Sequence, residues 1–164
     1  MQDPKIYATV LLDSLQKKFE VLKELLELTR KQNQLLSVQK IVELDTDSFD
    51  RIVDQKAEMI EKLDELDKGF ETIYERAGAY IAKNKYEFQS QIIQMQNHIR
   101  TITDISLQIQ GLEAQNKSRF NLFLKEKRNE ITNFKTSNKV AVSYYQNMAN
   151  QHREWQSHFL DKRK

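Results

Sequence analysis

Residues 47–75 read DSFDRIVDQKAEMIEKLDELDKGFETIYE, which is the pattern of a long amphipathic helix. Apolar side chains recur here at alternating steps of three and four residues, so they share one face of a helix. Continued to residue 80, this stripe consists of Phe49, Ile52, Lys56, Met59, Leu63, Leu66, Phe70, Ile73, Ala77 and Tyr80. Asp47 is placed to cap a helix that starts near Ser48, and Asp50 favours the positive end of that helix.

A second stripe precedes this stretch and predicts another long helix. Its members are Ala8, Leu12, Leu15, Phe19, Leu22 and Leu26. Asp3 is placed to cap this helix, and Pro4 suits the first helical position, so we expect it to run from there to about Val38. Thr29 and Asn33 fall where the stripe predicts core. They either mark a local opening or pair across the helices.

A third stripe follows residues 83–85, whose sequence KNK predicts a turn, with a continuous helix as the alternative. This stripe consists of Phe88, Ile92, Met95, Ile99, Ile102, Ile105, Ile109, Leu112, Asn116, Phe120, Phe123, Lys127, Ile131 and Phe134. At 1.5 Å per residue, one helix over this span would be about 70 Å long. The three stripes predict an all-α fold, an elongated antiparallel up-down-up bundle of three long helices.

The sequence TSNK at residues 136–139 predicts a turn between a helical bundle domain, residues 1–135, and a C-terminal tail, residues 136–164. The tail is expected to be a short helix or flexible. Its apolar residues at helical spacing are Val142, Tyr145, Met148, Ala149, His152, Trp155 and Phe159. Burying a large apolar side chain contributes about 1.5–3 kcal/mol, whereas ordering each backbone residue costs about 1–2 kcal/mol. The tail therefore either docks on its own bundle or stays mobile until a partner supplies a groove.

Charge is distributed unevenly along the 164 residues. Residues 1–70 hold 11 Lys and Arg against 15 Asp and Glu, while residues 117–164 hold 11 against 4. A basic C-terminal third attracts acidic proteins, nucleic acids or anionic membranes. Its basic residues are interspersed with glutamate and form no groove-reading motif, so nucleic-acid binding is not predicted. No apolar run approaches the length of a membrane span and no signal peptide is recognised, so we expect a cytoplasmic protein without membrane insertion.

The sequence offers no constellation for catalysis, a metal or a cofactor. It has no cysteine, and its histidines, His98, His152 and His158, lack convergent partners. Glu154 and His158 are four residues apart, but two ligands do not make a stable metal site. Three isolated glycines cannot form a phosphate-binding loop. We therefore predict no catalytic, metal or cofactor residues, and a protein that is not an enzyme.

Four segments together resemble flagellar export chaperones of the FlgN and FliT type. They are LLDSLQKKFEVLKELLELTRKQNQLL (11–36), the stretch 47–75 quoted above, LEAQNKSRF (112–120) and SNKVAVSYYQNM (137–148). The similarity spans about residues 7–148. The stretch 47–75 is the most telling, because members of this group typically read as a leucine-rich first helix followed by an acid-capped helix that contains a lysine.

The resemblance implies a cytoplasmic, non-enzymatic chaperone. Such a protein binds the helical terminus of a hook-associated or filament-cap subunit, prevents premature assembly and delivers the subunit to the type III export apparatus. The resemblance places subunit binding in the C-terminal helix, here at Val140, Val142, Tyr144, Tyr145 and Met148. We add Trp155 and Phe159 as expected contacts from the apolar face of the tail. The alternative is a structural coiled-coil adaptor or self-associating scaffold, such as a homodimer, without an export role.

Overall fold

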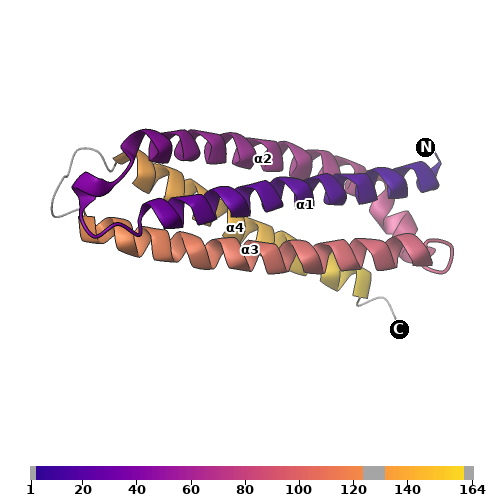
Figure 1. The fold of residues 1–164 in the computed structure, drawn as a ribbon. Helices are drawn as coiled ribbons and strands as arrows, with labels where there is room; N and C mark the ends of the chain where they lie inside the picture. Colours follow the sequence, from indigo (N-terminus) through magenta and orange to yellow (C-terminus); the bar gives the residue numbers. More distant parts are fainter. Residues whose placement is uncertain (1–2, 124–131, 161–164) are drawn as a thin grey trace.

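The computed structural model describes residues 3–123 and 132–160, with side chains described for residues 3–40, 42–123, 138–153 and 155. Its elements are α1 (Pro4–Leu35), the short 3-10 helix η1 (Ile41–Glu43), α2 (Thr46–Lys83), α3 (Gln89–Phe123) and α4 (Thr132–Leu160) (Figure 1). No strand occurs in the described ranges. The all-α fold with three long antiparallel helices is confirmed. None of the described helices is both long and apolar enough to cross a membrane.

The fourth helix, α4, packs as part of the bundle and does not extend away from it. α1 packs against both α2 and α3, and α4 packs against the same two helices. Figure 1 shows α1, α2 and α3 along one long axis, with α4 lying obliquely across them. We call α1, α2 and α3 the three-helix part. The main hydrophobic core contains residues from all four helices, so α4 takes the fourth position, across the core from α1.

The helix ends follow local capping. Asp3 caps α1 as expected, and its Oδ1 accepts from the Lys5 backbone N–H at 3.0 Å. The expected cap at Asp47 is wrong, because Asp45 caps α2 and its Oδ1 accepts from the Ser48 backbone N–H at 3.1 Å. Hydrogen bonds from Ser48 also lower the pKa of the Asp45 carboxyl, which favours its charged form at the positive helix end.

The ends of α1 and α3 differ from the sequence prediction, whereas the turn predicted near residues 83–85, after α2, is confirmed. α1 ends at Leu35 rather than near Val38, and α2 ends at Lys83, where the Asn84 amide donates to the Tyr80 carbonyl at 2.9 Å. The expectation of one helix from Phe88 to Phe134 is wrong, because α3 ends at Phe123 and Phe134 belongs to α4. Of the predicted stripe, Lys127 and Ile131 lie outside the described residues.

The turn expected at residues 136–139 is also wrong, since these residues lie inside α4. The physical reason is a tertiary hydrogen bond. Asn138 is buried, and its side-chain amide donates to Glu113 Oε2 of α3 at 2.8 Å. An asparagine with a buried partner on another helix no longer competes for its own backbone, so the helix continues through it.

Candidate partner-binding site

All seven residues predicted to bind a partner lie on α4. Tyr144, Tyr145, Met148 and Trp155 are buried against the three-helix part, Val142 is half-buried, and Val140 is 52% exposed. Phe159 belongs to α4, but its side chain lies outside the described residues. The structure therefore has the tail docked on its own bundle, one of the two arrangements that the sequence allows. The face of α4 that could contact a partner is largely occupied by internal contacts.

Aromatic packing holds the second half of α4. The Trp155 ring lies 4.6 Å from the Phe70 ring of α2, measured between centroids, and 5.3 Å from the His152 ring. The ammonium of Lys18 from α1 lies 5.7 Å from the centre of the Trp155 ring, within the range of a cation–π contact. Trp155 thus joins three helices at one point.

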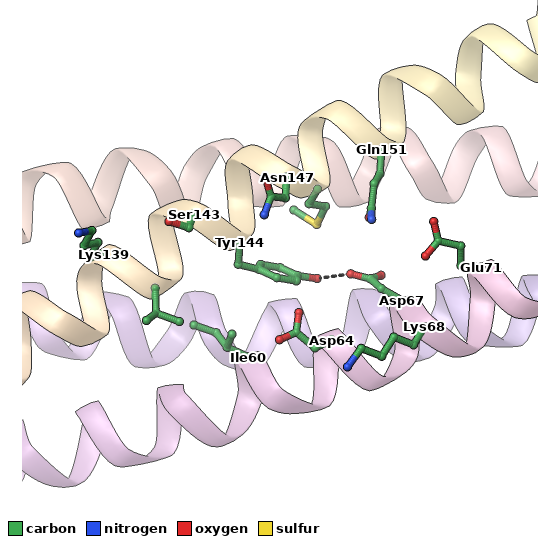
Figure 2. A pocket seen from close by; sticks show the side chains of 12 residues that line it. Ile60, Asp64, Asp67, Lys68, Glu71, Lys139, Ser143, Tyr144, Asn147 and Gln151 are labelled. Carbon is green, nitrogen blue, oxygen red and sulfur yellow. Dashed lines mark hydrogen bonds between the residues drawn. The ribbon is translucent and has the colours of Figure 1, made fainter.

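A buried polar cluster lies beside this tryptophan, and we call it the Lys18 cluster. Lys18 Nζ donates to Asp67 Oδ1 at 2.7 Å, and this ion pair connects α1 to α2. From α4, the Tyr144 hydroxyl donates to Asp67 Oδ2 at 2.9 Å (Figure 2). Burial raises the pKa of Tyr144, and the Asp67 charge raises it further, so this phenol stays a donor. Burial lowers the pKa of Lys18, while Asp67 opposes that change.

His152 completes the Lys18 cluster, and its proton position follows from its neighbours. Its Nε2 lies 3.3 Å from Lys18 Nζ, so it accepts from the ammonium, and its Nδ1 lies 3.1 Å from Thr103 Oγ1. The Thr103 hydroxyl donates to the Ile99 carbonyl at 2.8 Å and can therefore accept from Nδ1–H. Burial, and then the Lys18 charge, lower the pKa of His152 to about 3. The imidazole is neutral in the docked state.

A second buried cluster, which we call the Glu113 cluster, lies under the first half of α4. Lys56 of α2 forms an ion pair with Glu113 of α3, and Lys56 Nζ also donates to Gln32 Oε1 of α1 at 2.6 Å. α4 contributes the Asn138 amide described above. Burial lowers the pKa of Lys56, and Glu113 opposes that change. Both clusters thus have the same design, an ion pair within the three-helix part and neutral groups from α4.

Thr29 and Asn33, the polar positions in the stripe of the N-terminal helix, pair across the bundle. The Thr29 hydroxyl is buried and donates to the Leu25 carbonyl at 2.7 Å, while its own carbonyl accepts from the Asn116 amide at 3.3 Å. Asn33 donates to Asn116 Oδ1 at 3.0 Å. No local opening is needed to explain either residue.

Tyr145 is the one aromatic anchor of α4 whose hydroxyl has no hydrogen-bond partner among the described residues. It is fully buried. Burial raises its pKa well above the usual value, with a smaller contribution from Glu113. An unpaired buried hydroxyl costs about 1–3 kcal/mol, so it weakens the docking of α4 at this point.

A pocket of about 500 Å³ follows the seam between α2 and α4 (Figure 2). Asp64, Asp67 and Glu71 supply carboxylates from α2, and Asn147 and Gln151 supply amides from α4. No group of three or more metal-binding side chains is found in the part of the chain that the structure describes. The seam presents hydrogen-bonding groups beside apolar side chains, which suits contact with another polypeptide.

Sequence reasoning missed Lys18, Asp67, Glu113 and Asn138 as anchors of α4. A signal for the first two exists in the spacing. Lys18 follows Leu15 by three residues and precedes Leu22 by four, and Asp67 follows Leu63 by four, so both lie at core positions of their helices. A lysine and an aspartate at core positions of two predicted neighbouring helices are candidates for a buried pair.

Comparison with known protein families gives a match over most of the chain. The family described as FlgN protein matches residues 1–153, which include most of α4 but not Trp155 or Phe159. Neither the curated proteins nor the solved structures give a significant match.

Proposed function

The chain belongs to the FlgN family of flagellar export chaperones, and we propose that it binds the helical terminus of a hook-associated or filament-cap subunit through α4. In this proposal residues 136–164 are the partner-binding part, and residues 1–135 are the bundle that supports it. The chaperone acts in the cytoplasm without catalysing a reaction, keeps the subunit from assembling and delivers it to the export apparatus.

The observation that carries this proposal is the composition of the α4 face. Val140, Val142, Tyr144, Tyr145, Met148, Trp155 and Phe159 supply aromatic, aliphatic and thioether groups at helical spacing. Tyrosine, tryptophan and methionine are enriched where proteins bind other proteins, and methionine adapts its shape to different partners. An apolar helix face of this kind fits against the amphipathic helix of a subunit.

The composition of the two buried clusters is compatible with detachment of α4 from the three-helix part. Lys18 and Asp67 lie on α1 and α2, and Lys56 and Glu113 lie on α2 and α3, so both ion pairs remain paired when α4 moves away. α4 withdraws only neutral groups, such as the amide of Asn138. Detachment therefore leaves no buried charge without its partner, the situation that costs most. An incoming helix with hydroxyl or amide groups can replace the lost hydrogen bonds.

The proposal is tested by binding to flagellar subunits encoded in the same genome. Each hook-associated and cap protein is titrated into the full chain and into the variants Val140→Asp and Gln146→Asp. Both positions are exposed on α4, so both variants should fold. We expect one subunit to bind and Val140→Asp to weaken it about tenfold, while Gln146→Asp has no effect.

Three results would contradict the proposal. Absence of binding to every subunit argues against the chaperone role, and equal effects of the two variants argue against α4 as the contact. A tight homodimer in sedimentation, with α4 at its interface, would favour the self-associating scaffold instead.

A further inference from the structure

A groove between α1 and α2 lies on the side of α2 that faces away from α4. Its volume is about 870 Å³, and all of its described lining belongs to α1 and α2. At about 100° per residue, Leu66, Gly69 and Ile73 lie on the side of α2 opposite Asp64, Asp67 and Glu71, which line the seam with α4. The groove is therefore a separate surface from the candidate site described above.

The floor of the groove is apolar and partly open to solvent. Val21, Leu66 and Ile73 are half-buried, and Val10 is 42% exposed. The Ser14 hydroxyl donates to the Leu66 carbonyl at 3.4 Å, which connects α1 to α2, so this donor is not free for a ligand. The floor thus offers apolar contact more than hydrogen bonds.

Exposed apolar side chains continue this floor along both helices. Ile6 lies one turn before Val10 on the same face of α1 and is 53% exposed, and Tyr80 lies two turns after Ile73 on the same face of α2 and is 40% exposed. Three of the large exposed apolar residues of the described chain thus follow a single seam. Such a continuous exposed stripe is typical of an interaction surface.

Gly69 creates room in the middle of the groove. A side chain built at this position would meet nothing within 4 Å, so the absence of a Cβ is not required by packing within the protein. The gap lets another backbone approach α2 closely. The groove from Val10 to Glu24 extends for about 21 Å along α1, which matches a helix of about 14 residues.

The rim of the groove is acidic. It carries four carboxylates, from Asp13, Glu20, Glu24 and Glu65, against two ammonium groups, from Lys17 and Lys62. All six side chains are exposed. Two copies of this groove facing each other would bring like charges together, and an anionic membrane surface would also be repelled. A positively charged partner is favoured.

We infer that the α1–α2 groove is a second docking surface, whose occupant is a partner protein's amphipathic helix with an apolar ridge flanked by lysine or arginine. The ridge contacts the floor around Gly69, and the basic flanks face the carboxylates of the rim. Because this surface lies away from α4, it can be occupied while α4 is docked or engaged. The inference goes beyond subunit binding and does not depend on it.

The test uses two synthetic helical peptides of about 16 residues with the same leucine ridge, one flanked by lysines and the other by glutamates. Each is titrated into the full chain and into Gly69→Arg and Gly111→Arg. Gly111 is the matched control, because it is also an exposed helical glycine with nothing within 4 Å of an added Cβ. Both substitutions raise helix propensity, so both variants should fold.

We expect the lysine-flanked peptide to bind at least about tenfold more tightly than the glutamate-flanked one. Gly69→Arg should weaken the lysine-flanked peptide about tenfold, and Gly111→Arg should leave its affinity unchanged. Glu20 is exposed on the rim, and Glu20→Lys should reduce the ratio between the affinities of the two peptides.

Equal binding of the two peptides, or equal effects of the two glycine variants, would overturn the inference. So would a wild-type dimer in sedimentation that Gly69→Arg converts to a monomer, because the occupant would then be a second copy of the chain. If a glycine variant does not fold, the Glu20→Lys comparison decides by itself, and an unchanged preference between the peptides would overturn the inference.

Discussion

At the scale of single residues, the buried charges are paired within the three-helix part and receive only neutral partners from α4. Lys18 with Asp67, and Lys56 with Glu113, illustrate this arrangement. A buried ion pair contributes little net stability compared with apolar packing, but removal of one member is costly. The two clusters therefore determine where α4 docks more than they contribute to the free energy of docking.

Tyr144→Phe tests the hydrogen bond from α4 to Asp67. The substitution removes only the hydroxyl, and Asp67 keeps its pairing with Lys18. We expect the free energy of unfolding to fall by about 1.5–3 kcal/mol, as for hydrogen bonds to charged groups. Urea denaturation measures the change, with Tyr86→Phe as the control, since Tyr86 is 94% exposed. Equal stability of the two variants would mean that the Tyr144 hydroxyl does not hold α4.

Glu113→Gln tests the second ion pair. Lys56 would remain buried without its counter-charge, and we expect a loss of about 3–5 kcal/mol in the free energy of unfolding. The double variant Lys56→Met/Glu113→Gln removes the uncompensated charge, and the glutamine carbonyl still accepts from Asn138. It should recover most of the loss in the same denaturation experiment. If the losses caused by Lys56→Met alone and Glu113→Gln alone add up to the loss in the double variant, the two charges are not coupled.

His152 predicts the direction of a pH dependence. Its pKa is lowered to about 3 from an ordinary 6.5, so below pH 6.5 the unfolded chain binds a proton that the folded chain does not. Stability is fully present above 6.5 and is lost as the pH falls toward 3. The groups facing the ring are Lys18 of α1, Asp67 of α2 through that lysine, and Thr103 of α3.

Between pH 6.5 and pH 5 this histidine should account for a loss of about 1.6 kcal/mol in the free energy of unfolding. Urea denaturation at both pH values, on the wild type and on His152→Gln, measures its share. The variant should lose less stability over this interval. Parallel pH profiles would show that His152 is not held neutral in the docked helix.

At the scale of elements, the apolar stripes predict the three long helices because each stripe persists for many turns. The turn near residues 83–85 was predictable from the polar KNK sequence, whereas the end of α3 was not, since Phe120, Phe123, Ile131 and Phe134 continue the same rhythm. Residues 136–139 were predicted as a turn because serine and asparagine favour turns locally. The buried contact between Asn138 and Glu113 overrides that preference, and such a contact is not visible in the sequence.

The element α4 should open more easily than the other helices. It packs less extensively on α2 and α3 than α1 does, and it carries the unpaired hydroxyl of Tyr145. We expect amide hydrogens of α4 to exchange at a lower free-energy cost than those in the middle of α1. Native-state hydrogen exchange at low urea measures both. Exchange of α4 only through global unfolding would contradict a detachable helix.

At the scale of the whole molecule, the two candidate surfaces lie on opposite sides of α2. The sequence could indicate that the C-terminal residues form an apolar face, but not that this face fills the fourth position of the bundle, because periodicity does not specify which helices become neighbours. The sequence did not predict the α1–α2 groove either, because nothing in it distinguishes Val10 and Leu66, which line the groove, from other apolar residues of amphipathic helices.

The opposite placement predicts independent binding. Saturation of α4 with a flagellar subunit should leave the affinity of the lysine-flanked peptide for the α1–α2 groove unchanged within about threefold, because neither ligand contacts the surface of the other. Calorimetric titration of the peptide with and without the subunit measures the coupling. A larger change would mean that the two sides of α2 communicate.

Trp155 is the only tryptophan of the chain, and it lies against Phe70 where α4 meets α2. Its indole is 4% exposed, so its surroundings change from apolar packing to water if α4 leaves. The protein therefore contains an intrinsic fluorophore at the contact between α4 and α2. A red-shifted emission would follow detachment in real time, without any attached dye.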